Sequence, residues 1–330
     1  MNNRLKRFAW ASLGVLLLGC LIYESGPARI VSDLGLVGAG LIAIVALEFV
    51  VDGFHTLGWW FTFPFDVRRG SFPRLFFVRL AGTALNQTLP AASMGGEPAK
   101  VLLLRPHFSA ATAIATVMTS RLIFGLSKAG FIAFGSMVSW RRFQLPHAFS
   151  VAVLVGFMVT LFGSLVFLAL QLRGFTAATR GILARIPFPS RWRHGIQRLT
   201  PEIDEEIIAF YRSRPGDLAL AVFSHQLAFF CGVLQVSFLL GWLGLPRDFG
   251  TSLAIESFSM LLGFVTFVVP DLIGVQEGGK LLAFAALGLP AAAGVTVGIA
   301  FRLTSIVGAA AGLLALGALK GRQLPELVGS

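Results

Sequence analysis

Two matched sets of charged residues stand inside long apolar stretches of the sequence. Each set has a glutamate, a lysine three residues later, and an arginine 24 or 25 residues after the glutamate. The residues are Glu97, Lys100 and Arg121 in the first set and Glu277, Lys280 and Arg302 in the second. An arginine holds a phosphate through two parallel hydrogen bonds, and a lysine attracts it as a point charge. We therefore expect both sets to hold an anionic group, with the glutamates neutralising the empty site or taking up protons.

Helix-breaking residues precede each set. They are Pro90, Gly95 and Gly96 in the first stretch and Pro270 and Gly274 in the second. The interval from proline to glutamate is seven residues in both stretches. A helix that starts at such a break presents backbone N–H groups, which attract an anion. Asn86, just before the first break, is expected to bridge the interrupted backbone or to contact the ligand.

A stripe of three polar residues shares one face of an apolar helix. The stripe consists of Glu48, Asp52 and His55, at positions i, i+4 and i+7. An acid and an imidazole one turn apart can bind a metal. Such a stripe more often meets buried cations, and Arg121 and Lys128 are available, so no metal site is expected. Two single polar residues stand on other apolar helices: Glu256 is expected to line a cavity and His225 to be packed in the core.

The composition indicates that the elements carrying these residues are membrane helices. Of the 330 residues, 55% are hydrophobic and 13% are charged, against about 25% charged in an average soluble domain. A soluble globule of this size could not bury so much apolar side chain. The apolar runs are also much longer than the strands of about 10 alternating residues that build membrane barrels. The sequence therefore excludes soluble and disordered proteins and predicts an all-α polytopic membrane protein.

The expected spans form one membrane domain over residues 1–330, with roughly six full spans and two broken hairpins. The spans are Phe8–Tyr23 as an N-terminal anchor helix, Leu34–Phe63, Phe108–Trp140, His147–Leu172, Asp217–Leu243 and Leu289–Leu319. The two stretches with internal breaks, Leu75–Leu104 and Phe249–Leu287, are expected to form discontinuous or re-entrant hairpins, because broken helices are tolerated at membrane depth only inside protein or beside water. Because the two broken stretches match each other, we expect one repeat at residues 34–140 and a second at residues 216–319.

The distribution of positive charge predicts the orientation. With the N-terminus inside, most of the 27 lysines and arginines fall on the cytoplasmic side, as the positive-inside rule requires. Both termini are then cytoplasmic, in a bacterial-type inner (plasma) membrane, and the two hairpins enter from opposite sides. Inverted repeats with paired broken helices are the architecture of many secondary transporters. The net charge of +11 is attributed to this topology and to contact with anionic lipid, so no nucleic-acid partner is expected.

The segment 173–215 is expected to be a basic cytoplasmic loop. Thr200 and Pro201 have the types favoured at a helix start, and Ile203, Ile207 and Phe210 would then share one face. The segment could lie on anionic lipid as a surface helix or simply connect two spans.

The motifs of the hairpins resemble those of a known family. Asn86-x3-Pro90-x4-Gly95-Gly96-Glu97-Pro98, followed by Pro270-x3-Gly274-Val275-x-Glu277-Gly278, is similar to the flippase-like family also called the lysylphosphatidylglycerol synthase transmembrane region. The resemblance covers about residues 34–319. It implies movement of phospholipids or polyprenyl-linked intermediates between leaflets. Residues 254–257 and 274–279 further resemble the hopanoid-biosynthesis-associated branch. The soluble aminoacyl-transferase domain of some members is not expected here, nor is lysyl transfer.

Three functions remain open at this stage. The first is a lipid flippase or transporter whose midplane polar cavity binds an anionic or polar lipid headgroup. The second is an integral-membrane headgroup transferase that would use Glu48, Asp52, His55 and Glu97. The third is a non-catalytic membrane partner of lipid-biosynthesis enzymes, with 173–215 as its docking surface. The sequence has no nucleotide-binding glycine-rich loop, so neither ATP hydrolysis nor a cofactor is expected.

Overall fold

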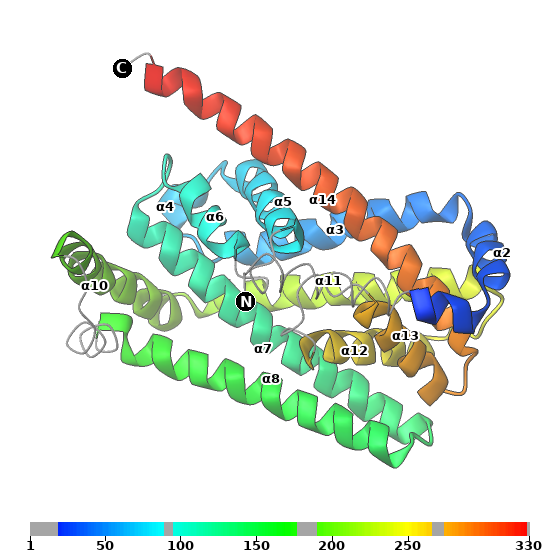
Figure 1. The fold of residues 1–330 in the computed structure, drawn as a ribbon. Coiled ribbons are helices and arrows are strands. Elements are labelled where there is room, and N and C mark those ends of the chain that lie inside the picture. The colour runs from blue at the N-terminus through cyan, green and yellow to red at the C-terminus, as the bar shows by residue number, and fades with distance from the viewer. Residues whose placement is uncertain (1–18, 89–94, 177–189, 266–273, 329–330) are drawn as a thin grey trace.

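A computed structural model describes residues 19–88, 95–176, 190–265 and 274–328, and within these ranges the chain is helical with no strand (Figure 1). The helices are α2 (Pro27–Val37), α3 (Gly40–Trp60), α4 (Phe65–Arg68), α5 (Phe72–Thr88), α6 (Gly96–Leu104), α7 (Ala110–Arg142), α8 (His147–Arg173), α10 (Ser190–Ser213), α11 (Pro215–Trp242), α12 (Phe249–Val265), α13 (Val275–Ala286) and α14 (Ala291–Val328). The all-α prediction is confirmed.

Among the described helices, five are long and apolar enough to cross a membrane. They are α3, α7, α8, α11 and the part of α14 from Ala291 to Leu319. They correspond to five of the six predicted spans. The sixth, residues 8–23, lies mostly outside the described residues. The predicted start at Leu34 is wrong, because the backbone turns at Gly38, with φ of 44°, and separates α2 from α3.

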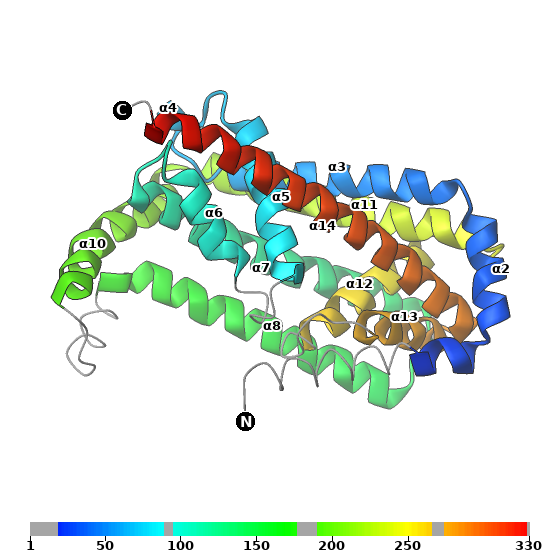
Figure 2. The ribbon, with the colours of Figure 1, turned by 45° about the horizontal axis from the view of Figure 1, so that its top comes forward.

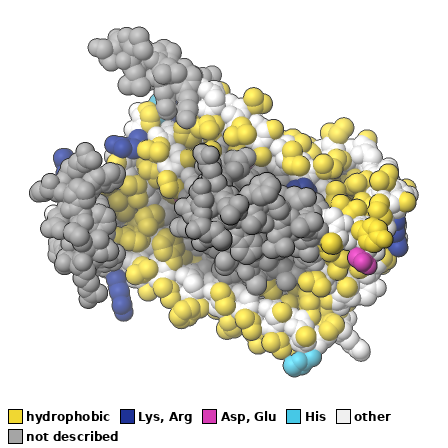
Figure 3. All heavy atoms as spheres, viewed as in Figure 1, with side chains coloured by type: hydrophobic (Ala, Val, Ile, Leu, Met, Phe, Trp, Pro, Cys, Tyr) yellow, Lys and Arg dark blue, Asp and Glu magenta, His cyan; other side chains and the backbone are white. Residues whose placement is uncertain are grey.

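The outer surface of the bundle is apolar. Helix α8 is hydrophobic on every side and leaves Leu154, Val155 and Phe162 exposed. On the face shown in Figure 3, hydrophobic side chains are spread over the whole described surface, and charged side chains are few. A large exposed apolar surface marks contact with lipid or with another protein. In a chain with five potential spans, lipid is the natural solvent for it.

The two long helices α3 and α11 pack against each other in opposite directions (Figures 1 and 2). Gly40 at the start of α3 contacts Trp242 at the end of α11, and Gly58 near the end of α3 contacts Ala221 near the start of α11. Helix α5 then returns antiparallel to α3, where Arg79 reaches Asp52. The same turn is made in the second half of the chain, where Gly241 of α11 contacts Arg247 and Gly232 contacts Glu256, so α12 returns antiparallel to α11.

The first helix of each predicted hairpin packs mainly on a long helix from the other half of the chain. Helix α5 packs most extensively on α14, and α12 packs most extensively on α7. Both pairs are antiparallel. Leu80 and Ala84 meet Gly312, and Arg142 at the end of α7 is paired with Asp248 just before α12. The helices of one predicted repeat therefore run opposite to their counterparts in the other, as inverted repeats do.

The basic segment differs from its prediction. It contains helix α10, which begins at Ser190 rather than at Thr200 and includes Pro201. Its apolar face is buried, because Ile203 and Ile207 pack against Ala111 and Ala115 of α7. This face is therefore not available to insert into lipid, and the segment is more than a loop.

Candidate functional site

The first hairpin is held together where α5 and α6 cross. Asn86 Oδ1 accepts a hydrogen bond of 2.6 Å from the backbone N–H of Gly96. A side chain at position 96 would collide with the carbonyl oxygen of Gly82, so the glycine permits the close approach of the two arms. Asn86 thus bridges the interrupted backbone, which was one of its two expected roles. The N–H of Gly96, expected to face an anion, is used by this bridge.

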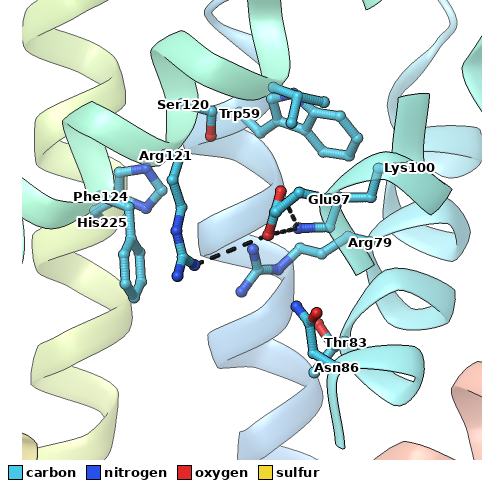
Figure 4. Close-up of a pocket in the computed structure, with 11 residues that line it drawn as sticks. Trp59, Arg79, Thr83, Asn86, Glu97, Lys100, Ser120, Arg121, Phe124 and His225 are labelled. Atoms are coloured by element: carbon cyan, nitrogen blue, oxygen red, sulfur yellow. Dashed lines mark hydrogen bonds and ion pairs between the residues drawn. The ribbon is translucent and has the colours of Figure 1, made fainter. Parts of the chain in front are cut away.

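A cavity of about 240 Å³ opens beside this crossing (Figure 4). It is lined by residues from α3, α5, α6, α7 and α11, among them Trp59, Arg79, Asn86, Glu97, Lys100, Arg121, Phe124 and His225. We call it the first cavity. Its lining carries three cationic side chains and one carboxylate, so it favours an anionic occupant. The first predicted set, Glu97, Lys100 and Arg121, is brought together here.

Glu97 is the centre of the charge network in the first cavity. Lys100 donates hydrogen bonds of 2.9 and 3.1 Å to its two carboxylate oxygens. The guanidinium of Arg121 approaches the same carboxylate only to 3.8 Å. Figure 4 shows Arg79 and Arg121 both extending toward Glu97 from different helices. Arg121 therefore has hydrogen-bond donors to offer a ligand, whereas Lys100 is occupied.

Arg79 lines the first cavity, although it was not among the predicted site residues. It lies within α5, and its Nε donates a hydrogen bond of 3.3 Å to Asp52 Oδ1 of α3. The polar stripe of α3 thus meets a cation, as expected, but the cation paired with Asp52 is Arg79 and not Arg121 or Lys128. No spacing rule could reveal this pair, because its members come from different helices.

His55 and His225 meet between α3 and α11. Their Nδ1 atoms are 2.9 Å apart, so one imidazole donates and the other accepts. Both rings are buried, and both pack edge-on against Phe124. His225, expected to be a packed core residue, is buried but also lines the first cavity. His55 lines a different cavity on the other side of this contact.

The second cavity has a volume of about 220 Å³ and shares Phe124 with the first. Its polar lining residues are Glu48, His55, Lys128, Gln235 and Glu256. Glu48 accepts a hydrogen bond of 2.9 Å from Gln235 Nε2. Glu256 lines this cavity, in agreement with its expected place. The two cavities therefore differ in charge, since the second has two carboxylates and one ammonium.

The second predicted set is distributed differently from the first. Glu277 is fully buried and accepts hydrogen bonds of 2.8 and 3.2 Å from Arg302. Lys280 lies 4.0 Å from Glu256 rather than bonding to Glu277. Among the described lining residues, Glu277 belongs to neither of these two cavities, whereas Glu97, Lys100 and Arg121 all line the first. Gly274 begins α13 in the left-handed conformation, with φ of 75°; Pro90 and Pro270 lie outside the described residues.

The stripe of Glu48, Asp52 and His55 does not form a metal site in the described part of the chain, where no group of three metal-ligating side chains occurs. Each member has its own partner on a different helix. Glu48 is bonded to Gln235, Asp52 to Arg79, and His55 to His225. The stripe therefore serves to join α3 to α5 and α11 and to line the second cavity.

The fold and the site define an all-α multi-pass membrane protein with two charged cavities among its long helices. Residues 8–312 match the family described as the lysylphosphatidylglycerol synthase TM region, and the chain belongs to this family. Comparison with curated proteins and with solved structures found no match. Membership links the protein to lipid metabolism or lipid translocation.

Proposed function

We propose that this protein moves lipids with an anionic headgroup between the leaflets of a bacterial-type inner membrane. The observation that carries the proposal is the charge of the first cavity, where Arg79, Lys100 and Arg121 oppose a single lining carboxylate, Glu97. Buried charge in a membrane is costly and marks a substrate or ion pathway. With Asp52 bonded to Arg79, one positive charge remains for a phosphate-bearing headgroup.

The position of the cavity suits a crossing headgroup. Arg79, Arg121 and His225 lie inside helices α5, α7 and α11, away from the helix ends. A headgroup held there would be shielded from the hydrocarbon while its tails stay in lipid along the apolar outer surface. Because each hairpin packs on the other half of the chain, movement of one half against the other could open the cavity to one side of the membrane and then to the other, as in transporters built from inverted repeats.

The substrate class follows from the same chemistry. Arg121 can hold a phosphate through a bidentate fork, which suits a phospholipid or a polyprenyl-linked phosphate. A hopanoid-related lipid fits this site if it bears an anionic headgroup. The transferase and complex-partner functions are alternatives that the following experiment distinguishes.

The test uses the purified protein in vesicles that contain fluorescent short-chain phosphatidylglycerol. A membrane-impermeant reductant quenches the outer leaflet, and flipping is measured as loss of inner-leaflet protection. We expect wild-type protein to flip the lipid and Arg121→Gln to slow flipping about tenfold or more, since a lost charge-assisted contact of about 1.4 kcal/mol is a factor of ten.

The matched control is Arg142→Gln on the same helix. The side chains of Arg121 and Arg142 are 48% and 51% exposed, but Arg142 pairs with Asp248 at the helix end, outside the first cavity. Equal slowing in both variants, or no flipping by wild-type protein, would contradict the proposal. Conversion of the lipid to a new species would support the transferase. If the protein neither flips nor converts the lipid, the result supports the role of a complex partner.

A further inference from the structure

The second cavity contains a buried carboxylate that is incompletely satisfied. Glu256 is 8% exposed, and its Oε2 atom accepts no hydrogen bond from the described residues. The nearest cation, the ammonium of Lys280, is 4.0 Å away, beyond hydrogen-bonding distance. A buried carboxylate oxygen without a donor is costly in a low-dielectric site. Addition of a proton to Glu256 would remove that cost.

A second carboxylate lines the same space from another helix. Glu48 of α3 is bonded to the side chain of Gln235, a neutral donor, and stands opposite Glu256 of α12. Two carboxylates in one cavity favour binding of a shared proton, because like charges raise the cost of ionising both. The other ionisable groups near this pair are Asp52 and His55 of α3, Arg79 of α5, Arg121 and Lys128 of α7, His225 of α11, Glu277 and Lys280 of α13, and Arg302 of α14.

These cations make a proton a better occupant than a metal ion. Lys128 lines the cavity and Lys280 approaches Glu256, so fixed positive charge already stands beside the carboxylates. A divalent metal cation would add two positive charges beside two ammonium groups, against one for a proton, and would need several oxygen ligands. A proton needs one carboxylate oxygen.

We propose that the second cavity is a proton-binding site, at which Glu48 and Glu256 take up a proton that the His55–His225 pair exchanges with the first cavity. This inference rests on the proposed lipid transport, which it extends by naming the coupling ion. Chains of Glu and His side chains are the usual proton relays of membrane pumps and transporters.

The histidine pair has the geometry of a relay. His55 lines the second cavity, His225 lines the first, and their Nδ1 atoms share a hydrogen bond of 2.9 Å. A carboxylic acid gives its proton to the free ring nitrogen of His55 and becomes a carboxylate. His55 passes its Nδ1 proton to Nδ1 of His225. Nε2 of His225 is buried against Gly58 and has no hydrogen-bond partner within the described chain, so His225 releases the proton from Nε2 when its ring turns toward the first cavity that it lines.

Coupling to the headgroup follows from charge. A proton bound in the second cavity makes the electrostatic potential in the first cavity more positive. This strengthens the binding of an anion in the first cavity. By linkage, binding of an anionic headgroup then increases proton uptake. Affinity for the anionic lipid should therefore rise as the pH falls, and each bound headgroup should bring in up to about one proton.

The first test needs no lipid. Infrared spectra of the purified protein, recorded during a pH titration, report a protonated carboxyl group directly. We expect a carboxylic acid band that grows on acidification and is lost in the Glu48→Gln/Glu256→Gln double variant. Glu206→Gln, which removes a half-buried acid of α10 outside both cavities, should retain the band. A double variant whose titration equals that of the wild type would overturn the proposal even if lipid transport is real.

The second test measures linkage by calorimetry. Dihexanoyl phosphatidylglycerol is titrated into the protein in two buffers of different ionisation enthalpy, which counts the protons bound. We expect uptake with wild-type protein and none with Glu256→Gln, which still binds the lipid. Gly232→Ala gives a variant with unchanged charge, because its methyl group would lie 2.8 Å from Glu256 Oε1 and displace the carboxylate; uptake should change there too. Lipid binding by the wild type without proton uptake would disprove coupling but not transport.

The relay itself is tested by rate. His55→Gln should slow flipping driven by a pH gradient, because the relay loses the imidazole that receives the proton. Gradient-driven flipping at the wild-type rate in this variant would overturn the relay. If wild-type protein neither binds nor flips any lipid, the proposed function fails, and the infrared titration still decides whether the proton site exists.

Discussion

Arg302 donates two hydrogen bonds to Glu277, whereas the equivalent arginine of the first repeat, Arg121, remains 3.8 Å from Glu97. The difference follows from the neighbouring lysines. Lys100 bonds to Glu97 and leaves Arg121 half exposed, while Lys280 turns toward Glu256 and leaves Glu277 to Arg302. The structure thus combines an open site in one repeat with a closed ion pair in the other.

The closed pair gives a prediction about stability. Glu277 is 1% exposed and Arg302 20% exposed, so removal of one partner leaves a buried charge uncompensated. We expect Arg302→Met or Glu277→Gln alone to lower the free energy of unfolding by about 3–5 kcal/mol. The double variant should be more stable than either single variant, since no unpaired charge remains. Chemical unfolding in detergent measures these values, and strictly additive losses would contradict a direct pair.

The hairpin crossing gives a second prediction. Asn86→Ala removes the acceptor for the backbone N–H of Gly96 and should destabilise the protein by about 1–3 kcal/mol, the cost of an unsatisfied buried donor. Asn86→Asp keeps an oxygen acceptor and should lose less. Gly96→Ala should be the most damaging, because no methyl group fits against Gly82. Thermal unfolding of the three variants tests this order, and equal melting temperatures for Asn86→Ala and wild type would refute the bridging role.

Local sequence patterns located the helices on either side of the two predicted breaks, whose prolines lie outside the described residues. The predicted stretches Leu75–Leu104 and Phe249–Leu287 correspond to α5 with α6 and to α12 with α13, because length, hydropathy and Pro/Gly breaks are properties of neighbouring residues. The i, i+3 spacing also placed Lys100 beside Glu97. The same spacing failed for Lys280, whose partner is set by tertiary packing.

Contacts between distant helices were beyond sequence reasoning for the same reason. Asp52 and Arg79 come from different helices, and so do His55 and His225, which are 170 residues apart. Nothing in the spacing of one helix specifies which residue of another will face it. Arg79 was therefore not among the predicted site residues, although it lines the first cavity.

The start of α12 gives a prediction about pH. Burial raises the pKa of Asp248, but hydrogen bonds from Thr251 and the charge of Arg142 outweigh burial, so the pKa lies below its ordinary value of 3.8. A lowered pKa means that the ionised form stabilises the fold. This stabilisation is fully present above the ordinary pKa and is lost as the pH falls through the lower folded-state value.

Comparison with Asp248→Asn isolates this effect. At pH 7 the wild type should melt at a higher temperature than the variant, and the difference should shrink as the solution is acidified below about pH 4. In an Arg142→Gln background, which lacks the ion pair with Asp248, the pH-dependent difference should be smaller. A gap between wild type and variant that stays constant from pH 7 to pH 3 would show that the charge of Asp248 contributes nothing to stability.

The orientation in the membrane gives the final prediction. Arg141 and Arg198 are exposed, the first at the end of α7 and the second on α10. In a background without Cys20 and Cys231, a cysteine at position 141 should react with an impermeant maleimide on intact cells. A cysteine at position 198 should react only after lysis, because positive charge is retained in the cytoplasm. The reverse labelling pattern would show that the whole protein has the opposite orientation in the membrane. It would not change the relation between the two halves of the chain, because the opposite directions of α3 and α11 are fixed by their contacts within the bundle and hold whichever side faces the cytoplasm.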